Sequence, residues 1–173
     1  MEVLKELPKI NLFDNPTGCC PKFHPEIYDD KIIELEGLDM VKTSTRSFLY
    51  MPLNMGSAMT KAMKTIRDND AEEAENYLIL SRDISMWKAE HYILVSKPVP
   101  NMENIKLSGI CLTKVFEGGY NQIPQWIKEM TSFVEEKGYD LEKIYSFYTT
   151  CPQCAKVYGK NYVVLFAEVG KQD

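Results

Sequence analysis

The chain has 173 residues, of which 45% are hydrophobic and 26% are charged, a composition typical of a globular protein with enough apolar material for a core. Its formal net charge of −5, without any cluster of basic residues, argues against nucleic-acid binding. No run of about 18 apolar residues predicts a membrane span, so no membrane partner is expected. The N-terminal residues also lack the continuous apolar stretch of a secretory signal, which favours a cytoplasmic protein.

Residues 1–40 are rich in proline and turn-forming residues, and we expect an irregular N-terminal extension there. The regular pattern begins with a predicted strand over 43–53. Ser57 can cap a helix whose apolar residues recur at helical spacing from Ala58 to Ile66. Two further strands are predicted over 77–81 and 90–96, joined by a turn at 83–85, and prolines close this first half near residue 100.

The same order of elements is then predicted a second time. A strand over 107–117 ends at two glycines, and a helix follows, with Pro124 in its first turn and Gly138 at its end. Strands are predicted over 143–150 and 162–169, with a loop over 151–161 between them. The apolar stripe of this second helix is expected to comprise Ile123, Trp126, Ile127, Met130, Phe133 and Val134.

The repeated order predicts an α+β fold in which two βαββ repeats form a mostly antiparallel sheet, with helices on one face and a ligand cleft on the other. The corresponding domain is expected over 41–173, with its halves at 41–100 and 101–173. Strand alternation gives one aliphatic face, including Leu80 and Leu165, and one face rich in aromatic side chains. The aromatic face either binds a planar ligand or is covered by residues 1–40 or by a second subunit, so the protein is expected to be a monomer or a homodimer.

The second half resembles the GyrI-like small-molecule-binding family. The resemblance lies in the run LTKVFEGGYNQIPQWIKEMTSFV and in the two strands IYSFYTT and YVVLFAEV that follow. A Glu-Gly-Gly-Tyr turn at Glu117–Tyr120 stands where that family has an H/E-G-P-Y turn, with Gly119 in place of the usual proline.

The resemblance implies that the protein binds apolar, aromatic or drug-like small molecules in a cleft between its two halves. It also implies two alternatives, namely a hydrolase of reactive compounds and a protein-interaction module such as a gyrase modulator. The position of the glutamate that attracts cations in drug-sensing members falls on Ser146 here, and Glu168 could supply a carboxylate in its place. The expected ligand-binding residues are Tyr50, Trp87, Tyr92, Tyr120, Trp126, Ser146, Tyr148, Phe166 and Glu168.

The five cysteines include two close pairs, Cys19-Cys20 and the CxxC pair Cys151 and Cys154. A CxxC turn presents two thiolates to one ion, which is half of a tetrahedral zinc site. If the N-terminal segment folds back onto the loop over 151–161, four sulfurs, or three sulfurs and His24, could bind a structural zinc ion. The alternatives are thiol–disulfide exchange through the CxxC pair and cysteines without special chemistry.

Two glutamates are candidates for catalysis in the hydrolase alternative. Glu117 lies beside the glycine turn and Tyr120, and Glu90 lies near Trp87 and His91 in the sequence. A carboxylate in an aromatic pocket can have a raised pKa and act as a general acid or base. The sequence contains no nucleophile elbow for a serine hydrolase and no phosphate-binding loop or HExxH motif.

Overall fold

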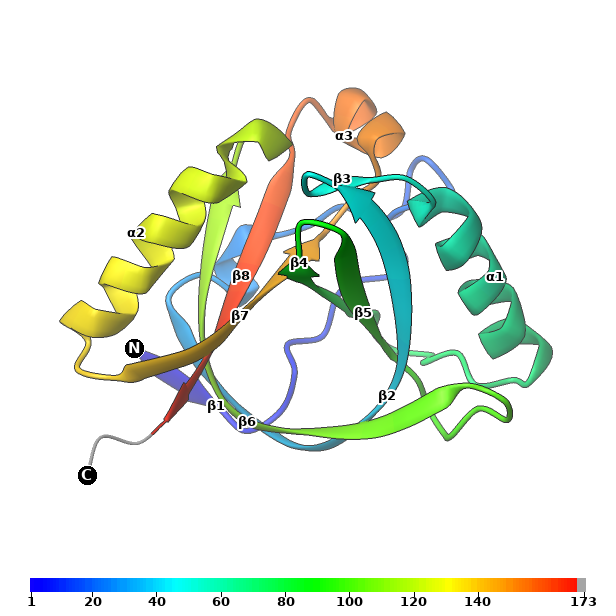
Figure 1. Cartoon of the computed structure of the whole chain (residues 1–173), viewed down its shortest axis with the longest axis horizontal. Coiled ribbons are helices and arrows are strands. Elements are labelled where there is room, and N and C mark those ends of the chain that lie inside the picture. The colour runs from blue at the N-terminus through cyan, green and yellow to red at the C-terminus, as the bar shows by residue number, and fades with distance from the viewer. Residues whose placement is uncertain (171–173) are drawn as a thin grey trace. The chain divides into compact units, whose positions relative to one another are not determined.

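The computed structural model describes residues 1–170 as a mixed α/β protein with a largely antiparallel sheet (Figure 1). The chain divides into two compact units. We call Met1–Glu36 with Ser108–Asp173 the split unit and Gly37–Leu107 the central unit. Within the described part of the chain, no helix is long and apolar enough to cross a membrane.

The split unit contains three antiparallel strands and the amphipathic helix α2. Strand β8 (Tyr162–Gly170) pairs on its two sides with β6 (Glu103–Glu117) and β7 (Asp140–Tyr148). The remaining elements of this unit are β1 (Glu2–Leu4), η1 (Pro25–Ile27), η2 (Tyr120–Gln122), α2 (Ile123–Glu136), α3 (Pro152–Tyr158) and the beginning of β2 (Lys31–Phe48).

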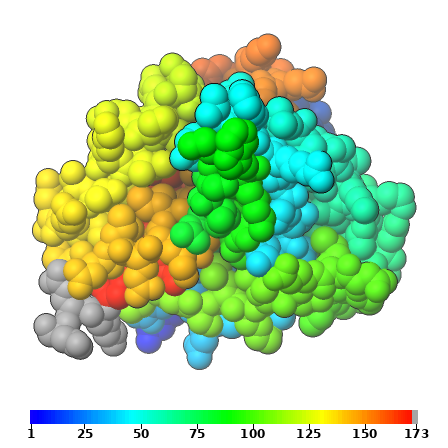
Figure 2. Space-filling view, viewed as in Figure 1, coloured from blue at the N-terminus to red at the C-terminus, as the bar shows by residue number. Residues whose placement is uncertain are grey.

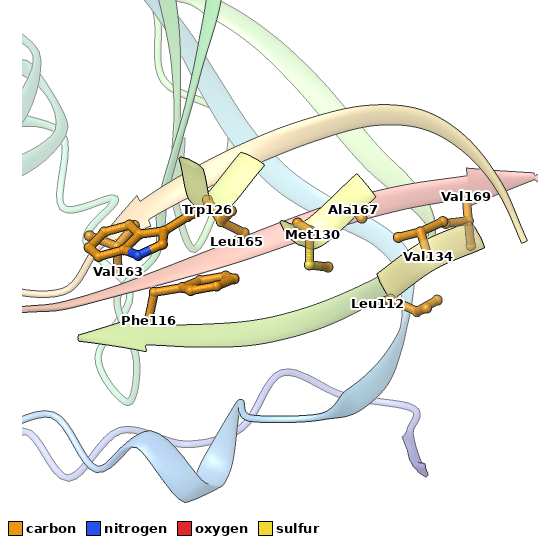
Figure 3. Packing of buried hydrophobic residues seen from close by; sticks show 9 residues of the cluster. All are labelled: Leu112, Phe116, Trp126, Met130, Val134, Val163, Leu165, Ala167 and Val169. Atoms are coloured by element: carbon orange, nitrogen blue, oxygen red, sulfur yellow. The ribbon is translucent and has the colours of Figure 1, made fainter. Parts of the chain in front are cut away.

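Helix α2 covers one face of this sheet with the apolar stripe that its sequence predicts, except for Ile127, which is exposed. Trp126, Met130 and Val134 lie one helical turn apart and are buried against the strands (Figure 3). Their partners on β6 and β8 are Leu112, Phe116, Val163, Leu165, Ala167 and Val169. Gly138, with a φ of 78°, ends the helix as expected, because glycine adopts this left-handed conformation without steric cost.

The opposite face of the sheet is covered by the N-terminal segment. Phe23 packs against Phe147 and Tyr162, and Tyr28 packs against Phe147 and Phe166, with ring centroids between 5.5 and 6.3 Å apart. The Thr113 hydroxyl fastens the same segment by donating to the Tyr28 carbonyl at 2.6 Å. In the split unit, therefore, the residues that precede β2 cover the aromatic side of β7 and β8.

The central unit is built from the rest of β2 with β3 (Met51–Pro52), α1 (Met55–Asp68), β4 (Ile79–Ser85) and β5 (Lys88–Leu94). Strand β5 pairs antiparallel with both β2 and β4. Ala62 and Ile66 of α1 pack against Val41 and Ile93 in a second hydrophobic core.

Several boundaries differ from the sequence prediction. Residues 31–40 were expected to be irregular but form the first part of β2, because Ile33, Leu35 and Met40 supply buried apolar side chains. The predicted loop over 151–161 contains helix α3, and α1 begins after Asn54 rather than after Ser57. The predicted strand over 43–53 is interrupted at Leu49 and Tyr50.

The predicted sheet face of Leu80 and the predicted position of the turn between β4 and β5 were also wrong. Leu80 pairs with Tyr92 and lies on the same side of the sheet as that ring, whereas Ile79 pairs with Ile93 on the side of α1. Strand β4 continues to Ser85, so the turn to β5 falls on residues 86 and 87 rather than on 83–85. The arrangement of the two halves as repeats around a cleft stays a prediction.

A buried histidine connects three strands of the central unit. His91 lies on β5, and its Nε2 and Nδ1 atoms are 2.9 Å from the Thr45 hydroxyl and 2.8 Å from the Ser81 hydroxyl. Burial lowers the pKa of His91, because the charged imidazolium loses its hydration inside the protein. The folded protein therefore holds this ring in its neutral form over a wider range of pH than the unfolded chain does.

Replacement of a core methionine tests the packing of α2. Met130 is fully buried, so Met130→Ala leaves a cavity and should lower the free energy of unfolding by about 2–5 kcal/mol in urea titrations. Met51→Ala removes the same atoms from a side chain that is 68% exposed. It should change the free energy of unfolding by less than about 0.5 kcal/mol. Equal losses in the two variants would contradict the packing described for α2.

The pH dependence of stability tests the environment of His91. Because its pKa is lowered on folding, the unfolded chain binds the proton first, and stability should decrease as the pH falls below about 6.5. Urea titrations at several pH values measure how the free energy of unfolding changes with pH. His91→Asn should make this change smaller. An NMR titration in which the His91 ring has the pKa of an exposed histidine would contradict this account.

Candidate functional site

The four cysteines of the two sequence pairs meet in the split unit. Their Sγ atoms all lie within 4.8 Å of one another, which confirms the prediction that the N-terminal pair folds back onto the CxxC pair. Among residues 1–170 no disulfide links them, and Cys111 is a fifth free cysteine buried on β6. We refer to Cys19, Cys20, Cys151 and Cys154 as the four-cysteine cluster.

Local structure around α3 sets the position of the CxxC pair. Cys151 is the N-cap of this helix, and its sulfur accepts a hydrogen bond from the Cys154 amide at 3.4 Å. Pro152 occupies the first turn, where its fixed φ favours helix formation and its missing N–H costs nothing. Cys154 therefore follows Cys151 by one helical turn, and both thiols lie at the same end of α3.

Polar contacts hold the N-terminal pair against α3. The Cys151 amide donates to the Cys20 sulfur at 3.4 Å, and the Tyr158 hydroxyl donates to the Cys20 carbonyl at 2.5 Å. The hydroxyl of Thr17 lies 3.3 Å from the Cys154 sulfur and 3.1 Å from the Tyr158 hydroxyl. Thr17 and Tyr158 were absent from the predicted site, since their isolated positions in the sequence carry no signal for metal or thiol chemistry.

The thiols of the cluster differ in acidity. The hydrogen bond with Thr17 is the main cause that lowers the pKa of Cys154 to about 7. Burial raises the pKa of Cys20 to about 12. Metal binding would deprotonate all four thiols, because the thiolate is the form that binds a metal ion. The cluster therefore could hold a metal ion.

His24 lies in a different environment from the cysteines. Its Nε2 atom is 3.2 Å from a carboxylate oxygen of Asp14, and its Nδ1 atom is 3.8 Å from one of Glu26. The residues close enough to share one ion, among those that the structure describes, are the four cysteines. The set of three sulfurs and His24 that the sequence also allowed does not form in this structure.

Glu90, one of the two predicted catalytic glutamates, lies within a set of polar groups in the central unit. The Tyr92 hydroxyl donates to its carboxylate at 2.8 Å, and Lys42 and Lys88 lie 3.8 and 3.4 Å away. Burial alone would raise the pKa of Glu90, but the Tyr92 hydroxyl and the two lysines outweigh burial and hold the pKa below its ordinary value. Burial, followed by the adjacent carboxylate, raises the pKa of Tyr92.

The other two carboxylates that the sequence singled out belong to the split unit. The Glu117 side chain is half exposed, and its carboxylate lies 3.7 Å from Lys160. The Glu168 side chain is only 14% exposed, and its carboxylate accepts hydrogen bonds from Tyr145 at 3.1 Å and Lys143 at 3.3 Å. Glu168 thus shares with Glu90 the combination of a tyrosine hydroxyl and a lysine.

The residues predicted to bind a ligand occupy several environments. Trp126 stacks on Phe116 under α2, and Ser146, Tyr148 and Phe166 also lie within or against packed parts of the split unit. The exposed Tyr120 ring meets Tyr148 edge to face at 5.6 Å.

Tyr50 and Trp87 lie at the tips of two adjacent hairpins in the central unit. The backbone links these tips, since the Ser47 amide donates to the Trp87 carbonyl and the Tyr50 amide donates to the Met86 carbonyl. The segments that form the tips lie at the surface in the space-filling view (Figure 2). The apolar side chains exposed there are Phe48, Leu49, Tyr50, Met51, Leu53, Ile84, Met86 and Trp87. We call these side chains the apolar tips.

Comparisons with known proteins identify the family. A family model described as bacterial hydrolase matches residues 10–169. The structure is also similar to the crystal structure of an uncharacterized conserved protein from Listeria innocua, with a TM-score of 0.60 and 11% identity, over 83% of this chain and 93% of that chain. At this identity the likeness concerns the fold, and no curated protein matches the chain. Because the family match spans almost the whole sequence, the chain belongs to the bacterial hydrolase family.

Proposed function

We propose that the protein hydrolyses a small organic molecule, with Glu90 as general base and Tyr92 as its proton-relay partner. The observation that carries this proposal is the 2.8 Å hydrogen bond between the Tyr92 hydroxyl and the Glu90 carboxylate. The family description as bacterial hydrolase supports the reaction class. The resemblance to GyrI-like proteins supports the same class of substrate, a small apolar or aromatic compound.

The charges around Glu90 suit a base rather than an acid. Its lowered pKa keeps the carboxylate ionised at neutral pH, while the raised pKa of Tyr92 keeps the hydroxyl protonated. Glu90 can therefore take a proton from an attacking water molecule. The proton of Tyr92 can pass to the leaving group, and Glu90 then returns its own proton to Tyr92, so the cycle ends with both residues in their initial states.

A binding protein without turnover is the second candidate, and the apolar tips favour it. Phe48 and Trp87 place their ring centroids 5.5 Å apart, and Tyr50 is also largely exposed. Aromatic surfaces of this kind bind planar compounds by stacking. The apolar tips would serve a hydrolase equally well for substrate binding, so catalysis by Glu90 is what distinguishes the two candidates.

In this proposal the four-cysteine cluster is a structural metal site and takes no part in hydrolysis. A catalytic zinc ion keeps one coordination position open for water or substrate, whereas four sulfur ligands fill all positions of a tetrahedral ion. The Glu90–Tyr92 pair would therefore act by acid–base chemistry alone.

Substitution of Glu90 tests the proposal. The purified protein is incubated with aryl esters, lactones and epoxides, and products are followed by mass spectrometry while binding is followed by tryptophan fluorescence. Glu90→Gln should lower kcat/KM by about 100-fold or more, because it removes the base and retains the shape of the side chain. Glu72→Gln alters an exposed glutamate paired with Arg67 and serves as the matched control.

The outcomes separate the alternatives. Saturable binding without product in the wild-type protein would leave the binding candidate and exclude hydrolysis of these compounds. Loss of turnover in Glu117→Gln or Glu168→Gln, with turnover retained in Glu90→Gln, would move the catalytic role to that residue. Binding of none of the compounds would contradict both candidates for this class of ligand.

The pH profile of the reaction is a separate prediction. Activity should decrease on the acid side only below the ordinary pKa range of glutamate, because Glu90 must be ionised and its pKa is lowered. Lys42→Met and Lys88→Met each remove a cation that stabilises the charged carboxylate, so each should shift the acid limb of kcat/KM to higher pH. An acid limb that stays in place in both variants would show that another group titrates.

A further inference from the structure

We propose that Cys19, Cys20, Cys151 and Cys154 bind one Zn²⁺ ion that fastens the N-terminal segment to helix α3. This inference names the ion of the structural metal site and the role of that ion in the fold. It does not depend on hydrolysis by Glu90. It rests on the positions of the four sulfurs, the contacts that fix them and the packing of the residues that follow.

The spacing of the sulfurs fits a tetrahedral zinc site. Zinc–sulfur bonds of about 2.3 Å place the sulfurs of a tetrahedron about 3.8 Å apart. The Cys19 and Cys20 sulfurs are 3.8 Å apart, and all four lie within 4.8 Å of one another. The largest separation therefore exceeds that of a tetrahedral site by about 1 Å at most.

Two backbone amides point to sulfurs of the cluster and favour the thiolate form there. The Cys151 amide points to the Cys20 sulfur, and the Cys154 amide points to the Cys151 sulfur. Hydrogen bonds of this kind, from donors around the site, orient metal ligands and stabilise their negative charge. Four thiolates so close together would repel one another strongly, and a divalent cation is the group that relieves this repulsion.

Ligand type selects the ion. Four soft sulfur ligands in tetrahedral arrangement favour zinc or iron over magnesium and calcium, which require oxygen ligands. Between the two, the general order of affinities of divalent ions places Zn²⁺ above Fe²⁺. We therefore assign zinc, and iron is an outcome that the experiment distinguishes.

The task of the ion follows from what lies beside the cluster. Phe23 is only three residues beyond Cys20 and packs on Phe147 and Tyr162 of the neighbouring strands. Thr17, on the other side of the pair, contacts both Cys154 and Tyr158. Zinc would thus anchor the segment over 17–23 at the point where it begins to cover the aromatic side of β7 and β8. Because the ligands come together only in the folded chain, the free energy of zinc binding adds to the stability of the fold.

Metal analysis of the folded, full-length protein tests the assignment. We expect one equivalent of zinc per chain by mass spectrometry, and X-ray absorption should show four sulfur neighbours at about 2.3 Å. Cys20→Ser and Cys151→Ser should each lose the stoichiometric metal. The matched control is Cys111→Ser, a buried cysteine outside the cluster that should retain one equivalent. Circular dichroism shows whether each variant is folded.

Limited proteolysis tests the task of the ion. Removal of the metal by a chelator should increase the rate of cleavage within residues 11–22, and addition of Zn²⁺ should restore protection. The Cys111→Ser protein should behave as the wild type does. Unchanged cleavage between the metal-loaded and metal-free forms would overturn the fastening role even if the ion binds.

Three results would overturn the zinc assignment. They are a folded wild-type protein that binds no metal even after incubation with Zn²⁺ under reducing conditions, one equivalent of iron in place of zinc, and a disulfide between Cys151 and Cys154 in protein purified without oxidant. Because none of these measurements uses a substrate, a failure of the hydrolase proposal leaves them unaffected, and the reverse also holds.

Discussion

The packing of the N-terminal segment against α3, β7 and β8 is the constraint on which the four-cysteine cluster depends. Neither cysteine pair forms a four-ligand site alone, and the two pairs are more than 100 residues apart in the sequence. The bonds from Cys151 and Tyr158 to Cys20 hold the pairs together, and the rings of Phe23 and Tyr28 hold the residues that follow. The segment that carries Cys19 and Cys20 is therefore held both by polar contacts to the cysteines and by the burial of its aromatic rings.

Features that depend on local periodicity or on chemically specific residues could be predicted from the sequence. The stripes of α1 and α2 follow from helical spacing, and Gly138 ends α2 where a left-handed conformation is required. The approach of the two cysteine pairs was also predictable, because two cysteine pairs in one chain indicate a shared metal or thiol site. Ordinary apolar residues carry no such signal.

Features that depend on tertiary context could not be predicted in the same way. The turn after β2 uses Leu49 and Tyr50, both with positive φ, where the usual sequence signal is Asn-Gly. Two bulky residues in this conformation cost strain that only the surrounding hairpins can balance, such as the bond from the Tyr50 amide to the Met86 carbonyl. Likewise, Trp126 and Tyr120 both suit an aromatic wall in sequence, but helix packing buries the first and leaves the second exposed.

The two candidate sites differ in how their charge is balanced, and this difference supports the different tasks that we propose for them. The single charge of Glu90 is met by Tyr92 and two lysines, which leaves the carboxylate ionised and able to exchange protons. The four thiolates of the cluster would carry more negative charge than one divalent ion neutralises, so they would bind that ion tightly and offer no open position for water. The hydrolysis that we propose requires a group that activates water. We therefore propose the Glu90–Tyr92 pair as the group that activates water and the cluster as the site that fastens the N-terminal segment.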